Sequence, residues 1–244
     1  MTTLSSAIAF QRIEYMEKPG ETLSVARRAP MPLRAISERR ESTPPAQRGD
    51  DARREQLLEV AIDALADCGL AGSTLAQIAG RANVSPGLIA HYFGDKDGLL
   101  EAAFRRLARR VQGAVRAKLR DAHSPRDRVM AIVDAHLAAE EFNQRTANAW
   151  LSFWGGVRHA ASLRRVQAAY QRRMLSHLRH ALRQLMPIAD ARQLAAMIAA
   201  MIDGVWLRAA LSDWKEADSE AAQALLADFI DGRLQSRPPE LRKR

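Results

Sequence analysis

The segment TLAQIAGRANVSPGLIAHYFGDK, residues 74–96, decides how the rest of the chain is interpreted. Thr74, with Gln77 three residues later, forms a capping-box pattern, and apolar residues at positions 75, 78, 79 and 82 share one helical face. Asn83 tolerates the left-handed backbone angles of a sharp turn, and Ser85 followed by Pro86 is typical of a new helix start. The segment therefore predicts a helix-turn-helix, whose second helix would lie in the major groove of DNA.

The sequence on either side predicts a bracing helix before this pair and a long helix after it. Apolar side chains recur at helical spacing over residues 53–68, at Leu57, Leu58, Ala61, Ile62 and Leu65. Gly69 is a typical helix end, and the only cysteine, Cys68, is expected to be a buried structural thiol. Asp95 fits the N-cap of a helix running to about Arg120. Lys96 lies beside the free N–H groups of that helix start, an arrangement that suits the binding of a phosphate. Alternatively, Lys96 is solvated.

The order of these segments resembles the DNA-binding head of TetR-family repressors over residues 53–105. It comprises a helix ending in CG, then TLAQIA, ANVS, and HYFGDKDGLL at the start of a long helix. Asn83 replaces the usual turn glycine, and Ala90 stands where an aromatic residue is common. The resemblance implies double-stranded operator DNA as partner, with Lys96 on its backbone. We expect Ile89 and Phe93 to face inward, and the DNA-binding residues to be Thr74, Ser85, Gly87, Leu88, His91, Tyr92 and Lys96.

The rest of the chain shows helical periodicity without convincing strand alternation. We expect helices at about 125–142, 145–155, 161–186, 190–213 and 218–234, separated by Asn143, the Gly155–Gly156 pair, Pro187 and the 213–218 loop. Asp190 with Gln193 suggests another capping box. The predicted fold is all-α, with a three-helix helix-turn-helix head (51–98) on a helical ligand-binding and dimerisation body (99–235). Residues 1–50 are expected to be a largely disordered arm, and residues 236–244 a basic tail.

Composition narrows the possible functions. The 244 residues carry a net charge of +9, which suits a polyanionic partner such as DNA or a membrane surface. No run approaches the roughly 18 apolar residues of a membrane span, and no signal-peptide pattern is present, so we expect a cytoplasmic protein. The sequence has no glycine-rich phosphate loop, nucleophile elbow or metalloprotease pattern. His177 and His180 share a helix face without further metal ligands, so we expect neither an enzyme nor a cofactor.

The four tryptophans all lie in the predicted body, although aromatic residues make up only 5% of the chain. Trp150 and Trp154 are one helical turn apart with Phe153 beside them, and Trp206 follows Asp203 on a later helix. These rings are either core side chains or the walls of a pocket. A pocket of several rings and a carboxylate suits a quaternary ammonium ligand, which has no N–H to donate and is held by cation–π contact and charge.

Two segments of the body carry a narrower resemblance. AWLSFWGGVRH (149–159) and AAMIDGVWLRAALS (199–212) are similar to the ligand body of BetI-type repressors, the choline-responsive branch of the TetR family that controls glycine betaine synthesis. This resemblance implies choline or betaine aldehyde as the effector, with Asp203 or Glu141 as counter-charge. Alternatively, Asp203 pairs with Arg208 and Glu141 is solvated. The predicted ligand-binding residues are Trp150, Phe153, Trp154, Asp203, Trp206, Glu141 and Tyr170.

The last two predicted helices are rich in small residues, as in AAMIAAMI (195–202) and SEAAQALLADFI (219–230). Small side chains permit close helix approach, which suits the four-helix interface of a homodimer or a helix pair within one core. We favour the homodimer, because a single reading head makes too few base contacts to be selective. Two other functions stay open: a TetR-type repressor of a multidrug efflux system sensing lipophilic cations, and a helical interaction module whose tryptophans form a partner surface.

Overall fold

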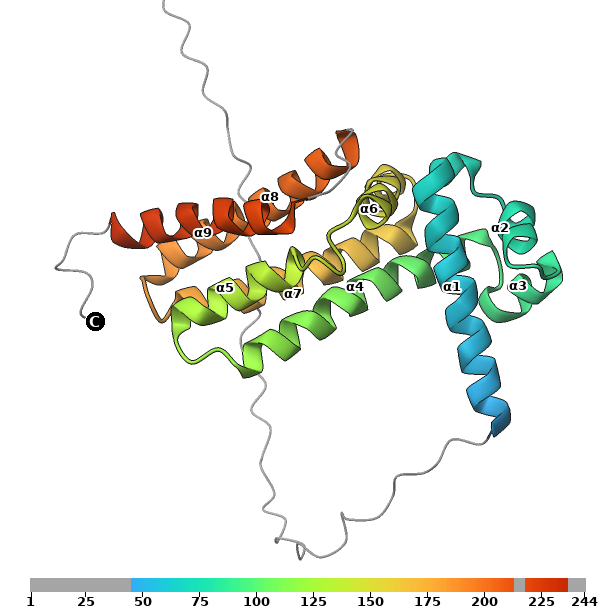
Figure 1. Ribbon diagram of the computed structural model, residues 1–244, viewed down its shortest axis with the longest axis horizontal. Helices are drawn as coiled ribbons and strands as arrows, with labels where there is room; N and C mark the ends of the chain where they lie inside the picture. The colour runs from blue at the N-terminus through green and yellow to red at the C-terminus, as the bar shows by residue number, and fades with distance from the viewer. Residues whose placement is uncertain (1–44, 213–217, 237–244) are drawn as a thin grey trace, which may run out of the picture. The chain divides into compact units, whose positions relative to one another are not determined.

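The computed structural model describes residues 45–212 and 218–236, and those residues form helices without any strand, so the all-α prediction is confirmed (Figure 1). The helices are α1 Pro45–Gly72, α2 Leu75–Arg81, α3 Pro86–Phe93, α4 Lys96–Arg120, α5 Pro125–His136, α6 Gln144–Val157, α7 Ala161–Leu182, α8 Ile188–Leu211 and α9 Ser219–Gln235. The predicted arm before residue 45, the 213–217 stretch with Trp214, and the tail after Ser236 lie outside the described residues.

The local signals of the helix-turn-helix are confirmed. The Thr74 hydroxyl accepts from the Gln77 N–H at 3.2 Å and the Gln77 side chain accepts from the Thr74 N–H, which completes the capping box of α2. Asn83 has a positive φ of 52° at the corner. The Ser85 hydroxyl caps α3 by accepting from the Leu88 N–H, and the Asp95 carboxylate caps α4 by accepting from the Gly98 N–H. Each cap satisfies a backbone donor that would otherwise lack a partner.

The first helix starts earlier than the sequence pattern predicts. It begins at Pro45, so residues 45–50 belong to α1 and not to an unstructured arm. Contacts with α3 explain the extension, because the Tyr92 hydroxyl donates to Asp50 at 3.0 Å and the Arg54 guanidinium lies 5.1 Å from the centre of the Phe93 ring. These contacts stabilise turns that have no apolar face of their own. At the other end, Gly69 breaks the helical geometry with φ 66°, as predicted.

The body differs from the predicted helix pattern in four places, one of which is the end of α7, at Leu182 and not at residue 186. Helix α5 ends at His136, and the Leu137 carbonyl accepts from the Ser219 hydroxyl and the Gln223 amide of α9. The Gly155–Gly156 pair does not end α6 but lies within it, and Gly156 packs closely against the side chains of Leu70 and Leu163. Helix α8 begins at Ile188 after Pro187, so Asp190 lies inside the first turn and is not its N-cap.

Helix α8 also corrects the prediction about membrane spans. Among the described residues it alone has the length and composition of a candidate span, with a mean hydropathy of 1.7. It contacts α6, α7 and α9, and the side chains that it buries include Leu194, Ile198, Ile202 and Trp206. These contacts are those of a core helix in a helical body.

Candidate functional site

The predicted recognition helix α3 presents a polar surface. Ser85, Gly87 and His91 are exposed, and Leu88 is half-buried. Ile89 is fully buried, so this helix turns one face to the core and leaves the other accessible. Thr74 is exposed at the start of α2. The accessible face therefore carries hydroxyl, imidazole and backbone groups of the kind that contact phosphates and base edges.

Besides Thr74 and Ser85, whose hydroxyls cap their helices, two of the predicted DNA ligands are bonded to residues of α1. The Tyr92 hydroxyl donates to Asp50, and this bond raises the pKa of Tyr92. The Lys96 ammonium donates to the Leu70 carbonyl at 3.0 Å, which ties the start of α4 to the end of α1. Lys96 retains further donors for a phosphate, since an ammonium group has three.

Aromatic side chains from α6 and α7 form one cluster in the body. The Trp150 ring centre lies 6.1 Å from that of Trp154, 5.6 Å from Phe153 and 5.1 Å from Tyr170. Trp150 and Tyr170 are buried, at 3% and 6% exposure, while Trp154 is half-buried. Trp150 is the centre of this cluster, and Tyr170, which the sequence pattern singled out only weakly, packs against it. The burial of Trp150 and Trp206 argues against the interpretation that the tryptophans form a partner surface.

A second aromatic pair joins the cluster through His136. The Phe142 and Trp206 rings meet edge to face at 4.9 Å. The Trp206 indole N–H donates to the His136 carbonyl at 3.1 Å, and the His136 ring centre lies 6.0 Å from that of Tyr170. Helices α5, α6, α7 and α8 therefore all contribute to one aromatic region. Sequence reasoning did not identify His136 and Phe142, because neither stands in a distinctive local pattern and only the packing brings them here.

The two candidate counter-charges lie in different surroundings. Asp203 accepts from the Gln171 amide at 2.8 Å rather than pairing with Arg208, and burial raises its pKa. Its negative charge adds to the desolvation that raises the pKa of Tyr170, which indicates that the carboxylate acts on the cluster. Glu141 lies 4.0 Å from Arg110; burial raises its pKa, and the arginine opposes that change. Asp203 is thus the carboxylate whose hydrogen-bond partner is neutral.

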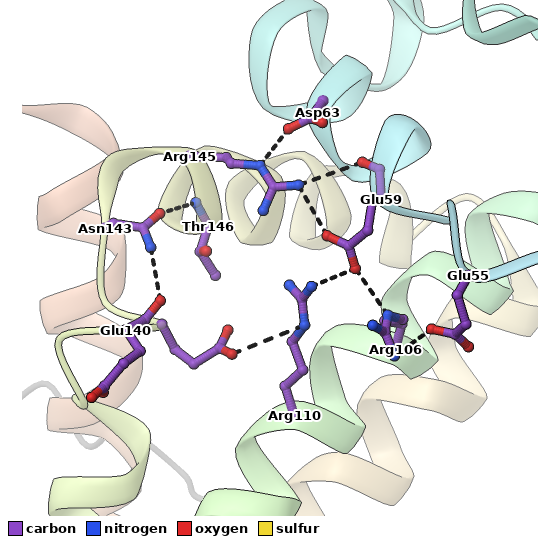
Figure 2. A network of polar contacts seen from close by, with 10 residues as sticks. Glu55, Glu59, Asp63, Arg106, Arg110, Glu140, Asn143, Arg145 and Thr146 are labelled. Atoms are coloured by element: carbon purple, nitrogen blue, oxygen red, sulfur yellow. Dashed lines mark hydrogen bonds and ion pairs between the residues drawn. The ribbon is translucent and has the colours of Figure 1, made fainter. Parts of the chain in front are cut away.

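An ion network connects α1 to α4 and α6 (Figure 2). The Glu59 carboxylate of α1 accepts from Arg106 at 2.9 Å, from Arg110, and from Arg145 at 3.2 Å. Arg145, in the first turn of α6, also donates to Asp63 of α1. Although burial raises the pKa of Glu59, the hydrogen bonds from Arg106 and Arg110 hold it below its ordinary value. A single carboxylate therefore joins the head helix to two body helices.

The packing of α6 ties the body to the head. Its most extensive contacts are with α1. Ser152 of α6 donates to the Leu65 carbonyl of α1 at 2.9 Å, which adds a second polar link to that of Arg145. The tryptophan-bearing helix thus lies directly on the helix that braces the reading pair.

Among the described residues, no group of three or more His, Cys, Asp or Glu side chains is placed to hold a metal ion. Cys68 is exposed, which contradicts the buried thiol expected from the sequence. Cys68 lies on the same face of α1 as Ala61 and Leu65, but at the end of that face beside Gly69, where the guanidinium of Arg81 lies 3.3 Å from its sulfur.

An accessible recognition helix in a three-helix head, attached to a helical body, defines a helix-turn-helix DNA-binding protein. Comparison with known proteins is more specific. Residues 57–103 match the family "Bacterial regulatory proteins, tetR family", and residues 125–235 match "BetI-type transcriptional repressor, C-terminal". The HTH-type transcriptional regulator BetI of Paraburkholderia phytofirmans is 42% identical over 188 residues, which cover 77% of this chain and 96% of that protein. BetI 1 of Chromohalobacter salexigens is 40% identical over 75% of this chain and 90% of its own.

Solved structures agree with this assignment. A transcriptional regulator from Pseudomonas aeruginosa PAO1 aligns with a TM-score of 0.68 and 27% identity, over 77% of this chain and 92% of its own. A regulator from Saccharomonospora viridis, solved in complex with choline, shares the fold with a TM-score of 0.62 and 22% identity, over 74% of this chain and 96% of its own. The chain belongs to the TetR family and is a BetI-like transcriptional repressor. It is a DNA-binding regulator and not an enzyme, and regulators of this family usually act as homodimers on operator DNA.

Proposed function

We propose that this chain is a cytoplasmic, homodimeric repressor of the choline-to-glycine betaine pathway that releases its operator when choline binds the body. The observation that carries the proposal is the cluster of Trp150, Trp154 and Tyr170 near the half-buried Asp203. The BetI names of the relatives support the pathway, and the choline complex of the Saccharomonospora viridis regulator supports the ligand.

The chemistry of the cluster suits a trimethylammonium group. Such a cation has no N–H donor, so aromatic faces and a negative charge are the groups that can hold it. Each good ring contact contributes on the order of 0.5–2 kcal/mol. Asp203 supplies the charge, since its hydrogen-bond partner is the neutral Gln171 amide and not an arginine. Trp206 and Phe153 support the walls, and Glu141 is the alternative counter-charge.

The outer groove between α4 and α7 is an unsuitable place for this cation. It encloses about 320 Å³, reaches Tyr170, and is lined by Arg105, Arg109, Arg165 and Arg173 without any carboxylate. Positive charge there disfavours an ammonium group. The inner faces of the rings are the better site, and because the rings contact one another, the ligand must spread them to bind.

Separation of the rings by the ligand links ligand binding in the body to DNA binding by the head. Trp150 and Trp154 lie on α6, and α6 is attached to α1 through Arg145, Glu59 and Asp63. A displacement of α6 therefore moves the helix that braces α2 and α3, and so changes the separation of the two heads in a dimer. Successive major grooves on one face of DNA lie about 34–36 Å apart, so a change in head separation weakens binding.

The operator contacts follow from the accessible face of the head. We propose that Ser85, Gly87, Leu88 and His91, which lie on this face, contact the major groove, with Leu88 meeting a thymine methyl group. Thr74, Tyr92 and Lys96 hold the phosphate backbone. For Tyr92 and Lys96, this requires the bonds to Asp50 and the Leu70 carbonyl to rearrange or to be shared with DNA.

Tryptophan fluorescence during a choline titration tests this function. Choline should quench the emission saturably, and Trp154→Ala should lose most of that change. Saturating choline should also weaken binding to promoter DNA upstream of the chain's own gene by about 5- to 150-fold. A flat titration, or unchanged DNA affinity, refutes choline as effector. A bulky aromatic cation titrated in parallel distinguishes the efflux-repressor alternative, which requires that cation to act more strongly than choline.

A further inference from the structure

His136 carries a buried hydrogen-bond acceptor that has no partner. The residue is 2% exposed, and its Nε2 makes no hydrogen bond to any described residue. The other ring nitrogen, Nδ1, lies 2.6 Å from the Ile132 carbonyl oxygen, one turn back in α5. A carbonyl only accepts, so Nδ1 holds the proton and Nε2 keeps a free lone pair. Because Nδ1 faces its own helix, Nε2 at the far end of the ring points away from α5.

The imidazole stays neutral at physiological pH. Burial lowers the pKa of His136 to about 4, and the nearby His177 contributes in the same direction. Nε2 can therefore accept a hydrogen bond but not donate one, and the ring brings no positive charge to the site. A buried acceptor without a partner is uncommon in folded proteins and calls for an explanation.

The position of the ring provides that explanation. It lies at one end of a row of aromatic rings, 6.0 Å from Tyr170, which in turn lies 5.1 Å from Trp150. The bond from the Trp206 indole to the His136 carbonyl fixes the backbone of this residue at the same place. We infer that Nε2 of His136 accepts a hydrogen bond from the hydroxyl group of the effector, and so makes the aromatic site selective for a quaternary ammonium alcohol. This inference rests on the proposed function, because it concerns the same site.

The chemistry separates the pathway's substrate from its products. Choline carries an O–H donor two carbons from its ammonium nitrogen. The carbonyl of betaine aldehyde and the carboxylate of glycine betaine offer only lone pairs, which would face the lone pair of Nε2. The repressor should therefore respond to the alcohol and discriminate against both oxidised forms.

Three ligands test the inference on the unmodified full-length chain by calorimetry. They are choline, propyltrimethylammonium, which replaces the hydroxyl by a methyl group, and (2-methoxyethyl)trimethylammonium, which retains the oxygen but cannot donate. Choline should bind roughly tenfold more tightly than either analogue. Equal binding of all three refutes the role of His136 and leaves choline sensing intact. Absence of binding by all three refutes the proposed function and this inference together.

Substitution of the residue provides the second test. His136→Phe keeps a ring of similar size and removes the acceptor, so it should abolish the preference for choline while retaining affinity for propyltrimethylammonium. His180→Phe, at an exposed position of α7, is the matched control and should keep the preference. A preference that persists in His136→Phe refutes the inference.

A spectroscopic measurement covers the case in which His136→Phe fails to fold. In the ¹⁵N spectrum of the unmodified protein, choline should shift the Nε2 resonance of His136, and the methyl ether should not. An unchanged resonance at saturating choline shows that a buried water or nothing occupies Nε2, and overturns the inference.

Discussion

Asn83 holds the corner between α2 and α3. Its φ of 52° is the only positive value for a non-glycine residue among the described residues. Asparagine adopts such angles more readily than other side chains, and a β-branched residue adopts them poorly. Asn83→Val should therefore lower the free energy of unfolding by roughly 1–2 kcal/mol, measured by urea denaturation. Asn83→Gly is the control, because glycine reaches the same angles without strain. Equal losses in both variants would show that the side chain matters and not the backbone angle.

His136 should make the protein less stable in mildly acidic solution. Its pKa is about 4 in the folded state against an ordinary value of 6.5, so between these values the unfolded chain binds the extra proton. The free energy of unfolding should then fall by roughly 3 kcal/mol as the pH drops through this window. His177, whose pKa burial also lowers, adds to the effect. Urea denaturation of the unmodified protein and of His136→Phe at several pH values measures this effect. If the free energy of unfolding changes equally with pH in both proteins, the low pKa does not belong to His136.

Residue-level prediction from sequence succeeded where the cause is local. The caps at Thr74, Ser85 and Asp95 were predicted correctly, because a capping side chain bonds to backbone only a few residues away. Cys68 was predicted wrongly, because it continues the apolar face of α1 but lies where that face ends, and the packing of segments distant in sequence decides its exposure there. His136 was missed for the same reason, since its role depends on rings from three other helices.

Among the contacts between helices, the network around Glu59 is the most concentrated. The side chain of Glu59 is 31% exposed, and its carboxylate forms ion pairs with Arg106, Arg110 and Arg145. Glu59→Ala leaves three arginines short of a partner, so we expect a loss of roughly 1–3 kcal/mol in the free energy of unfolding. Glu101→Ala removes the carboxylate of a pair with Arg105 within one helix and should cost less than about 0.5 kcal/mol. Thermal melts compare the two variants, and similar shifts would contradict the special role of Glu59.

The helix boundaries show the limit of periodicity as a signal. Periodicity located α4 correctly because its apolar face is continuous, from Leu99 to Val115. It extended α5 too far, since the Leu137 carbonyl is satisfied by α9, a segment distant in sequence. It started α1 too late, since contacts with Tyr92 and Phe93 replace an apolar face there.

For the whole molecule, the exposed apolar side chains of the C-terminal helices support dimerisation. Leu211 is 69% exposed and Leu225 is 56% exposed, on α8 and α9 respectively. Such residues are typical of a surface that a second copy covers. Leu225→Glu should shift the protein from dimer to monomer in analytical ultracentrifugation and weaken operator binding in parallel. Ala168→Glu, on the exposed side of α7, is the control. A dimer that persists in Leu225→Glu would place the interface elsewhere.

The fold as a whole was more predictable than the candidate site. An all-α architecture follows from apolar periodicity along each segment, and the family resemblance followed from contiguous motifs in the head. The site combines Trp150, Tyr170, Asp203 and His136 from four helices, and their separation along the chain conceals their proximity. Trp150, Tyr170 and Asp203 were candidates from the sequence, but the sequence did not show whether Asp203 or Glu141 lies near the rings.

The exposed thiol of Cys68 has a practical consequence for measuring the regulatory motion. The chain has one cysteine, and it lies at the end of the helix that braces the reading pair. A nitroxide attached there gives a dimer two spin labels, one in each head, without any prior mutagenesis. Pulsed electron paramagnetic resonance then records the distance between the heads in solution, and a comparison with and without choline measures the proposed conformational switch in ångströms.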